Sequence, residues 1–220
     1  MKYFNVRTIS YLPIIVIAAM LAGCSSSPKL LNLDTAKKEV GLYYESGQYD
    51  KDVQEVVEDA IKDFDGVKVR DSSAVVFDVD ETVLSNYSEI KSVGFGFEGE
   101  HWNRWILEGK APAIEGVKNL YNYLIGRKFR ILFLTGRTMA QYEATYRNLK
   151  QAGYTTFDTL IVRQGSMLKA PAENFKSIER TVLTDMGYKI EGCVGDQLSD
   201  LQGAYTGIKI KLPNYLYLVD

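Results

Sequence analysis

Three acidic side chains stand together at the end of an apolar run, in the segment Ala74 to Asn86, AVVFDVDETVLSN. Charges at the mouth of a buried strand lose hydration and repel one another, so a partner should offset them. Asp78 and Asp80 project to the same side of an extended chain, and Glu81 and Thr82 follow directly. A magnesium ion bound with a phosphate ester would offset these acids.

Other apolar runs end in polar residues of the kinds that such chemistry requires. These are Thr135, Gly136 and Arg137 after RILFL, Lys176 in the NFKSIER helix after TLIVRQ, and Asp196 and Asp200 in GDQLSD after KIEGCV. Carboxylates, a hydroxyl and a lysine from distant parts of the chain would meet if these runs formed one sheet.

The elements that would position these residues alternate along the chain. The runs AVVFDVD, RILFLTG, TLIVRQ, KIEGCVGD and GIKIKLP are strand-like, and helices are expected from about Gly116, Thr138, Glu173 and Ser199. Near-continuous apolar strands that alternate with helices predict an α/β fold with a Rossmann-like parallel sheet covered on both faces. Ligands of such sheets bind beyond the carboxyl ends of the strands, where the polar residues lie.

Two segments flank this pattern within the predicted domain, residues 34–220. Residues 34–66 read as two helices broken near Ser46 and Gly47, and their apolar spacing predicts packing against the main domain. Residues from about 84 to 113 have no clear period and carry YSEIKSVGFGFEGEHWNRW. An irregular insertion straight after the first strand predicts a small helical cap over the site.

The N-terminus resembles a bacterial lipoprotein signal. Lys2 and Arg7 precede a short apolar run that ends in Leu21-Ala22-Gly23-Cys24, similar to a lipobox. Residues 1–23 are therefore expected to be a signal peptide, Cys24 the lipidated residue, and residues 24–33 a tether. A plain secretory signal is the alternative. Lipidation would place the protein in the bacterial cell envelope, on the outer membrane or cell surface, facing the periplasm or exterior.

Composition excludes little beyond these features. The chain has 220 residues, a net charge of −2, and 46% hydrophobic and 25% charged residues, which suits one globular domain. No basic excess indicates a nucleic acid polymer as partner. With Cys24 lipidated, Cys193 would be left without an internal disulfide partner. The oligomeric state is not indicated.

The motifs DVDET, LTGR, the lysine of NFKSIER and GDQLSD resemble the four motifs of the haloacid dehalogenase (HAD) superfamily. From about Val40 onward the chain is similar to bacterial class C acid phosphatases, which are surface lipoproteins, and to plant acid phosphatases and vegetative storage proteins. The resemblance implies a magnesium-dependent phosphomonoesterase, with a small phosphomonoester such as a nucleoside monophosphate as substrate.

The expected roles follow from phosphoryl chemistry. Asp78 would attack phosphorus and form an aspartyl-phosphate, while Asp80 would protonate the leaving oxygen and then activate water. This needs a neutral Asp80 first, which favours acidic pH. Magnesium would be held by the side chains of Asp78 and Asp196 and the Asp80 carbonyl, with Asp200 orienting the shell. Thr135 and Gly136 would contact the phosphoryl group, and Lys176 would offset its charge.

Structural alternatives exist for each of these residues. Asp78 and Asp80 could form a structural metal site or cap a helix, and the same capping role is open to Thr135 and Asp200. Thr82 is expected to stabilise the turn. The alternatives to Lys176 are Lys169 and Arg180, and Arg137 and Arg180 are expected to hold loops through ion pairs.

The cap is rich in aromatic residues. Trp102 and Trp105 lie three apart, on one face if this piece is helical. They would either pack the cap or stack on a flat leaving group, as would Tyr87, Phe95 and Phe97. His101, the sole histidine, is expected to have a surface or packing role.

Rival functions remain open on the same fold. A dehalogenase would not need Asp80, and a P-type ATPase would have Thr in its place, so both acids favour a phosphatase or phosphotransferase. A non-enzymatic storage or binding protein is the competing class, but the intact Asp78 weighs against it.

Overall fold

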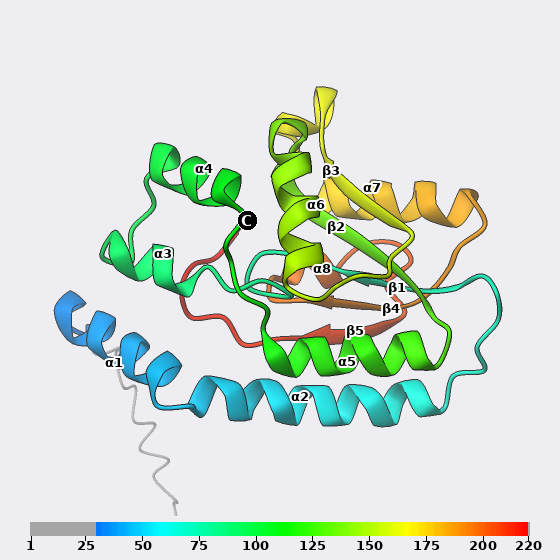
Figure 1. Ribbon diagram of the computed structural model, residues 1–220, viewed down its shortest axis with the longest axis horizontal. Coiled ribbons are helices and arrows are strands. Elements are labelled where there is room, and N and C mark those ends of the chain that lie inside the picture. The colour runs from blue at the N-terminus through cyan, green and yellow to red at the C-terminus, as the bar shows by residue number, and fades with distance from the viewer. Residues whose placement is uncertain (1–29, 220) are drawn as a thin grey trace, which may run out of the picture. The chain divides into compact units, whose positions relative to one another are not determined.

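Five parallel strands form one sheet in the order β3-β2-β1-β4-β5 (Figure 1). The strands are β1 (Ser73–Phe77), β2 (Arg130–Thr138), β3 (Thr159–Arg163), β4 (Lys189–Gly195) and β5 (Ile208–Lys211). The computed structural model describes residues 30–219. The expected signal peptide, Cys24 and most of the tether lie outside this range.

Helices cover both faces of the sheet, because the side chains of the buried strands alternate between two apolar clusters. Val75 and Phe77 of β1 pack in the larger cluster with α2 (Gln48–Asp65), α5 (Glu115–Gly126) and α6 (Tyr142–Gln151). Ala74 and Val76 face the smaller cluster with α7 (Ala172–Asp185) and α8 (Leu198–Leu201). The predicted Rossmann-like parallel sheet with helices on both faces is confirmed.

The chain reverses its direction of winding between β1 and β4. The strands β1, β2 and β3 extend the sheet to one side, and the chain then returns to place β4 and β5 on the other side. The two neighbouring strands continue to pair at their carboxyl ends, where the Asp78 amide donates to the Val194 carbonyl at 2.9 Å. Parallel sheets of this kind bind ligands at such a switch point.

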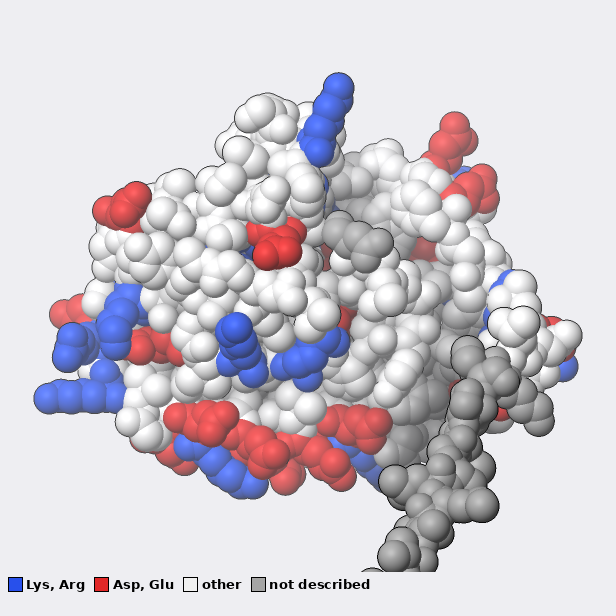
Figure 2. Space-filling model, turned by 180° about the vertical axis from the view of Figure 1, so that it is seen from behind, with Lys and Arg blue, Asp and Glu red and all other residues white. Residues whose placement is uncertain are grey.

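Two N-terminal helices, α1 (Leu33–Glu45) and α2, are separated at Ser46 and Gly47. The apolar face of α2 is buried against α5 and β5 through Tyr49, Val53, Val57, Ala60 and Phe64. Its outer face carries seven acids and two lysines. Figure 2 shows acidic side chains gathered along the lower edge of the molecule, where α2 runs. This edge therefore repels polyanions.

The insertion after β1 forms two short helices, α3 (Tyr87–Ser92) and α4 (Gly99–Glu108), in agreement with the small helical cap that was expected although its sequence has no clear period. An antiparallel bridge between Leu84 and Ala113 joins its two ends beside the sheet. Helices of six and ten residues show too few turns for a clear apolar repeat. Among residues 30–219, no helix is both long and apolar enough to cross a membrane.

Candidate active site

Three carboxylates converge at the switch point between β1 and β4. Asp78 directly follows β1, Asp196 directly follows β4, and Asp200 lies in α8. Each offers an oxygen that lies within 4.8 Å of the others, and all three side chains are buried. The structure therefore brings together three of the four acids for which the sequence predicts a metal site.

Lys176 reaches this cluster from α7. Its ammonium lies 2.6 Å from Oδ1 of Asp78 and also pairs with Oδ1 of Asp200. The side chain is only 7% exposed, so both pairs form away from bulk water. The alternatives behave differently, since Lys169 is exposed and Arg180 donates to the backbone carbonyls of Asp200, Gln202 and Ala204. Arg180 thus holds a loop, as expected, but through carbonyl groups.

Asp200 caps α8, one of the two roles that the sequence left open, and it also pairs with Lys176, while its expected role in the metal shell stays a prediction. Its Oδ1 pairs with Lys176, and its Oδ2 accepts the Gln197 amide at 2.9 Å in the capping box of α8. Gly195 makes room for this arrangement, because a Cβ at that position would lie 2.2 Å from Oδ2 of Asp200. The end of β4 is therefore shaped around the Asp200 carboxylate.

Thr82 and two amides fix the remaining acids. The Thr82 hydroxyl is 3.1 Å from Oδ1 of Asp196 and 3.4 Å from Oδ2 of Asp78, and it accepts the Asp196 amide. The other oxygen of Asp196 accepts from Gln197 at 2.5 Å and Asn214 at 2.6 Å. Thr82 therefore ties the end of β1 to the end of β4, which extends the turn-stabilising role expected for it.

Burial and repulsion from neighbouring acids raise the pKa values of Asp78 and Asp196. Burial raises the pKa of Asp78 well above its usual range; Lys176 opposes this rise, and Asp200 and Asp196 add to it. Burial, with Asp200, raises the pKa of Asp196 to about 6. Burial lowers the pKa of Lys176, but Asp78 and Asp200 more than offset this and raise it, so the ammonium stays charged. Additional positive charge would stabilise the ionised cluster.

Asp80 lies apart from this cluster and is held by Arg137. The guanidinium donates from Nη2 to Oδ1 of Asp80 at 2.7 Å and from Nε to Oδ2 at 3.1 Å. Asn86 donates a further bond to Oδ1 at 2.9 Å. The Asp80 side chain is 16% exposed and lines a cavity that Asp78 and Asp196 also line. The expected ion pair of Arg137 thus orients the second acid of DVDET.

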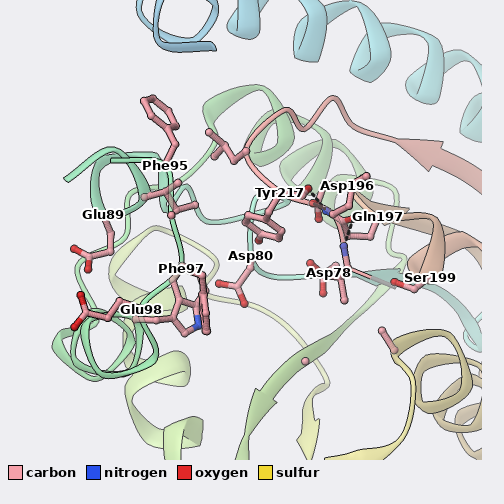
Figure 3. A pocket seen from close by; sticks show the side chains of 18 of the residues that line it. Asp78, Asp80, Glu89, Phe95, Phe97, Glu98, Asp196, Gln197, Ser199 and Tyr217 are labelled. Atoms are coloured by element: carbon pink, nitrogen blue, oxygen red, sulfur yellow. Dashed lines mark hydrogen bonds between the residues drawn. The ribbon is translucent and has the colours of Figure 1, made fainter. Parts of the chain in front are cut away.

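A cavity of about 470 Å³ opens beside the acids. Asp78, Asp196 and Gln197 lie on one side of it, and Glu89, Phe95, Phe97 and Glu98 of the insertion lie on the other (Figure 3). Asp80 and Tyr217 stand between these two groups. The C-terminal residues Leu216 to Val219 complete the lining. The insertion and the tail thus border a space large enough for the leaving group of a small ester.

The residues after β2's apolar run occupy two positions. Gly136 lines the cavity, whereas Thr135 is fully buried and its hydroxyl accepts the Arg137 amide at 3.2 Å. The capping box of the next turn is formed by Thr138 and Gln141, so Thr135 does not cap it. Contact of Thr135 and Gly136 with a phosphoryl group remains a prediction.

The two tryptophans of the insertion do not act together. Trp102 lines the cavity beside Phe97, with ring centroids 6.3 Å apart. Trp105 does not line it; its indole N–H donates to Asn86 at 2.8 Å and its ring packs on the larger core cluster. The predicted substrate contact of Trp105 is corrected, because α4 lies between cavity and core. His101 lines the cavity near Glu89 and Glu98, at 3.9 and 3.7 Å.

Sequence reasoning missed a buried polar group behind Asp80. Glu81 has a φ of 52°, is only 3% exposed, and accepts bonds from the Asn86 amide and from Tyr217. Burial, with the nearby Asp80 charge, raises its pKa to about 8. A buried acid with a positive φ indicates local strain that its neighbours maintain. The acid-rich DVDET pattern marks Glu81, but nothing in the pattern of the tail marks Tyr217.

The donor set suits a divalent cation. The clustered ligand atoms of Asp78, Asp196 and Asp200 are all carboxylate oxygens, which hard cations such as Mg²⁺ prefer. Burial and the neighbouring acids raise the pKa values of Asp78 and Asp196, so a bound cation would stabilise their ionised forms. The backbone carbonyl expected from Asp80 stays a prediction.

Fold and site together define a HAD-type phosphatase. A family model described as HAD superfamily, subfamily IIIB (Acid phosphatase) matches residues 26–220. The chain therefore belongs to this acid phosphatase family, and the resemblance seen in its four motifs is confirmed.

The relatives include enzymes and proteins named for storage or for plant stems. The chain is 37% identical over 183 residues to the stem 28 kDa glycoprotein of Glycine max, covering 80% of this chain and 72% of the relative. Identity to acid phosphatase 1 of Solanum lycopersicum is 34%, covering 66% of this chain and 58% of the relative. Vegetative storage protein 1 of Arabidopsis thaliana is 32% identical, covering 86% and 74%.

Solved structures show the same fold. The class C acid phosphatase of Bacillus anthracis matches with a TM-score of 0.69 and 22% identity, over 84% of this chain and 86% of that one. A second structure of the B. anthracis enzyme, with tungstate bound, matches with a TM-score of 0.67 and 21% identity, over 83% and 86%.

Proposed function

We propose that this protein is a magnesium-dependent acid phosphatase that hydrolyses small phosphomonoesters through an aspartyl-phosphate on Asp78. The observation that carries the proposal is the convergence of Asp78, Asp196 and Asp200 around Lys176 at the switch point of the sheet. A phosphate ester dianion repels a carboxylate nucleophile, so attack requires a site in which positive charge surrounds both groups.

Magnesium would be held by Asp78, Asp196 and Asp200, and it would supply charge neutralisation for the ester oxygens. Thr82, Gln197 and Asn214 hold these carboxylates in place before substrate arrives. Lys176 keeps one oxygen of Asp78 partnered at 2.6 Å. The other, Oδ2, has only the 3.4 Å contact with Thr82 among described residues and is the oxygen that attacks phosphorus.

Asp80 supplies and then removes a proton. It lies in the cavity between the acid cluster and the insertion, where a leaving group would stand. Asp80 donates a proton to the leaving oxygen and later accepts one from the water that hydrolyses the aspartyl-phosphate. Arg137 and Asn86 set the orientation of the carboxyl group, so they are positioning residues for this step.

The experiment is an assay of p-nitrophenyl phosphate hydrolysis from about pH 4 to 8, with magnesium, with EDTA, and with Asp78→Asn. The expected result is turnover that favours acidic pH and is abolished by either change. Asp59→Asn, in an exposed pair with Lys62 on α2, is the matched control and should retain full turnover. Activity that persists in EDTA and in Asp78→Asn would reject the mechanism.

A storage or binding role is the second candidate, and the plant relatives named for storage favour considering it. The two functions differ in one observation. A pure protein with no turnover over that pH range, which still binds phosphate with magnesium, would support the binding role and would contradict hydrolysis.

Nucleoside monophosphates are the proposed substrates. Phe95 and Phe97 lie across the cavity from Asp78 (Figure 3), Trp102 also lines it, and these rings offer flat faces to a base. Turnover measured over a panel of nucleotides, sugar phosphates and aryl phosphates tests this. A preference for nucleotides is expected; equal kcat/KM across the panel would contradict it.

The proposed location is a bacterial cell envelope, with the domain tethered through a lipid on Cys24. The lipobox-like sequence Leu21 to Cys24 supports this proposal. Growth with a labelled fatty acid should label the wild type and not Cys24→Ser. A labelled Cys24→Ser protein, or an unlabelled wild type, would contradict it.

A further inference from the structure

Arg163 is the last residue of β3 and stands at the same edge of the sheet as Asp78. It lines the cavity together with Gly136, Ala172 and Lys176. In the sheet it pairs with Thr138 of β2. Its side chain lies over β2, because its Nε would stand 3.8 Å from a Cβ placed on Gly136. The guanidinium therefore points from β3 toward the strand that separates it from Asp78.

The contacts of this guanidinium leave its charge uncompensated. Nη1 donates to the Ala170 carbonyl at 2.7 Å, and the group lies 5.1 Å from the centroid of the Phe175 ring. Nε is buried and has no hydrogen-bond partner within the described part of the chain. Burial lowers the pKa of Arg163, and no charge from the described residues opposes this effect.

Other cations at the site differ in this respect. Lys176 pairs with Asp78 and Asp200, and Arg137 pairs with Asp80. Arg163 forms no ion pair with any residue between 30 and 219. A partly buried arginine without a carboxylate is costly unless an anion joins it. The cavity is the side from which such an anion can arrive.

Charge balance at the acid cluster indicates which anion is needed. The three clustered carboxylates carry three negative charges when ionised, and Lys176 with one divalent cation offsets all three. A phosphate ester dianion then enters without a counter-charge of its own. Arg163 supplies one, and α7 adds its N-terminal dipole because it begins at Ala172 in the cavity wall.

We propose that Arg163 binds the non-bridging oxygens of the phosphoryl group that is transferred to Asp78, from the side of the cavity next to Gly136. This rests on the proposed phosphatase function and adds a substrate-binding residue to it. An arginine presents several N–H donors in a planar fork that matches phosphate oxygens. The bond to Ala170 and the Phe175 ring hold this fork in place before substrate binds.

The test compares Arg163→Gln and Arg163→Lys with the wild type. One readout is kcat/KM for p-nitrophenyl phosphate, whose only anionic group is the transferred phosphoryl. The other is the dissociation constant of inorganic phosphate with magnesium, measured by calorimetry. Arg163→Gln should weaken both by about 10- to 100-fold, the value of a charged hydrogen-bonding pair. Arg163→Lys should recover part of the loss because it restores the charge.

Arg130→Gln is the matched control. Arg130 begins β2, donates to the Asp71 carbonyl, and pairs with Asp158 away from the cavity. The Arg130→Gln variant should leave both kcat/KM and the dissociation constant of phosphate unchanged. Both Arg163 variants lose the planar group over Phe175, so a merely structural role would lower melting temperature and activity alike in both. A charge-dependent recovery in phosphate affinity separates binding from packing.

Three outcomes would overturn the inference: unchanged kcat/KM and phosphate affinity in Arg163→Gln, equal losses in the Gln and Lys variants, or losses confined to substrates that carry a second anionic group. The last would assign Arg163 to the leaving group. If the wild type turns over no monoester, the proposed function fails, and the calorimetric comparison still decides the role of Arg163.

Discussion

The sheet edge and the insertion form opposite sides of one cavity and are built differently. At the sheet edge, Asp78, Lys176, Asp196 and Asp200 are at most 7% exposed and each has a fixed partner. In the insertion, Phe97 is 80% exposed, and His101 approaches its acidic neighbours no closer than 3.7 Å. Groups that perform chemistry need fixed geometry, whereas groups that select a leaving group can be adaptable. We therefore expect the sheet edge to determine the rate of the reaction and the insertion to determine the substrate preference.

The largest effect is expected for Asp78→Asn. Loss of the nucleophile should lower kcat on the order of 10⁴-fold or more for every phosphomonoester, because the phosphoenzyme cannot form. Steady-state kinetics on an aryl and an aliphatic ester measure this. A loss that depends strongly on the ester would show that Asp78 belongs to substrate selection instead.

Lys176→Met should come next, with kcat reduced roughly 10²- to 10³-fold. Removal of the ammonium leaves Asp78 and Asp200 unscreened, so magnesium should bind at least as tightly as in the wild type. Calorimetric titration with Mg²⁺ alongside kinetics checks both statements. Weaker magnesium binding with unchanged turnover would contradict the assigned role.

Arg137→Met should lower kcat by about tenfold, because Asp80 loses the bidentate partner that orients it. The pH profile of kcat should also shift, whereas the dissociation constant of magnesium should not. A variant with an unchanged pH profile would show that Arg137 acts on loop packing alone.

The two tryptophans of the insertion offer a matched pair. Trp102→Ala should raise KM about 2- to 10-fold for aromatic esters and leave small aliphatic esters unaffected. Trp105→Ala should change KM to the same extent for aromatic and aliphatic esters. It should also lower the free energy of unfolding by about 2 kcal/mol, since the Trp105 ring packs on the core. Kinetics on both esters and chemical denaturation separate the cases. Identical behaviour of the two variants would remove the distinction between cavity and core.

Glu81→Gln tests the polar group behind the edge. Burial and the nearby Asp80 charge raise the pKa of Glu81 from its usual value of 4.5 to about 8, so the folded state holds a proton that the unfolded state releases. Stability from this group is full below about pH 4.5 and declines as pH rises toward 8. Between pH 5 and 7 the free energy of unfolding of the wild type should fall by about 2 kcal/mol more than that of Glu81→Gln. Chemical denaturation of both proteins in EDTA at the two pH values measures this difference. An equal change in the free energy of unfolding of the wild type and Glu81→Gln would contradict it.

Much of the framework could be predicted from the sequence because its strands are buried on both faces and read as continuous apolar runs, such as Val75 to Phe77. Placement of Asp78 and Asp196 followed, since parallel strands end at one edge, and that of Lys176 followed from its position in the helix after β3. Side-chain contacts between residues far apart in the sequence leave no comparable pattern in it. Tyr217 meets Glu81 from 136 residues away, and Trp105 faces Asn86 because of where α4 happens to lie. Arg163 could have been found, since it also ends a strand.

The proposed mechanism requires that Asp78 becomes phosphorylated in a magnesium-dependent way. The direct measurement is mass spectrometry of the peptide containing Asp78 after rapid acid quench of the enzyme with substrate. We expect an added phosphate on Asp78 with magnesium, and none with EDTA or in Asp78→Asn. Phosphate on another residue, or equal labelling in EDTA, would contradict it.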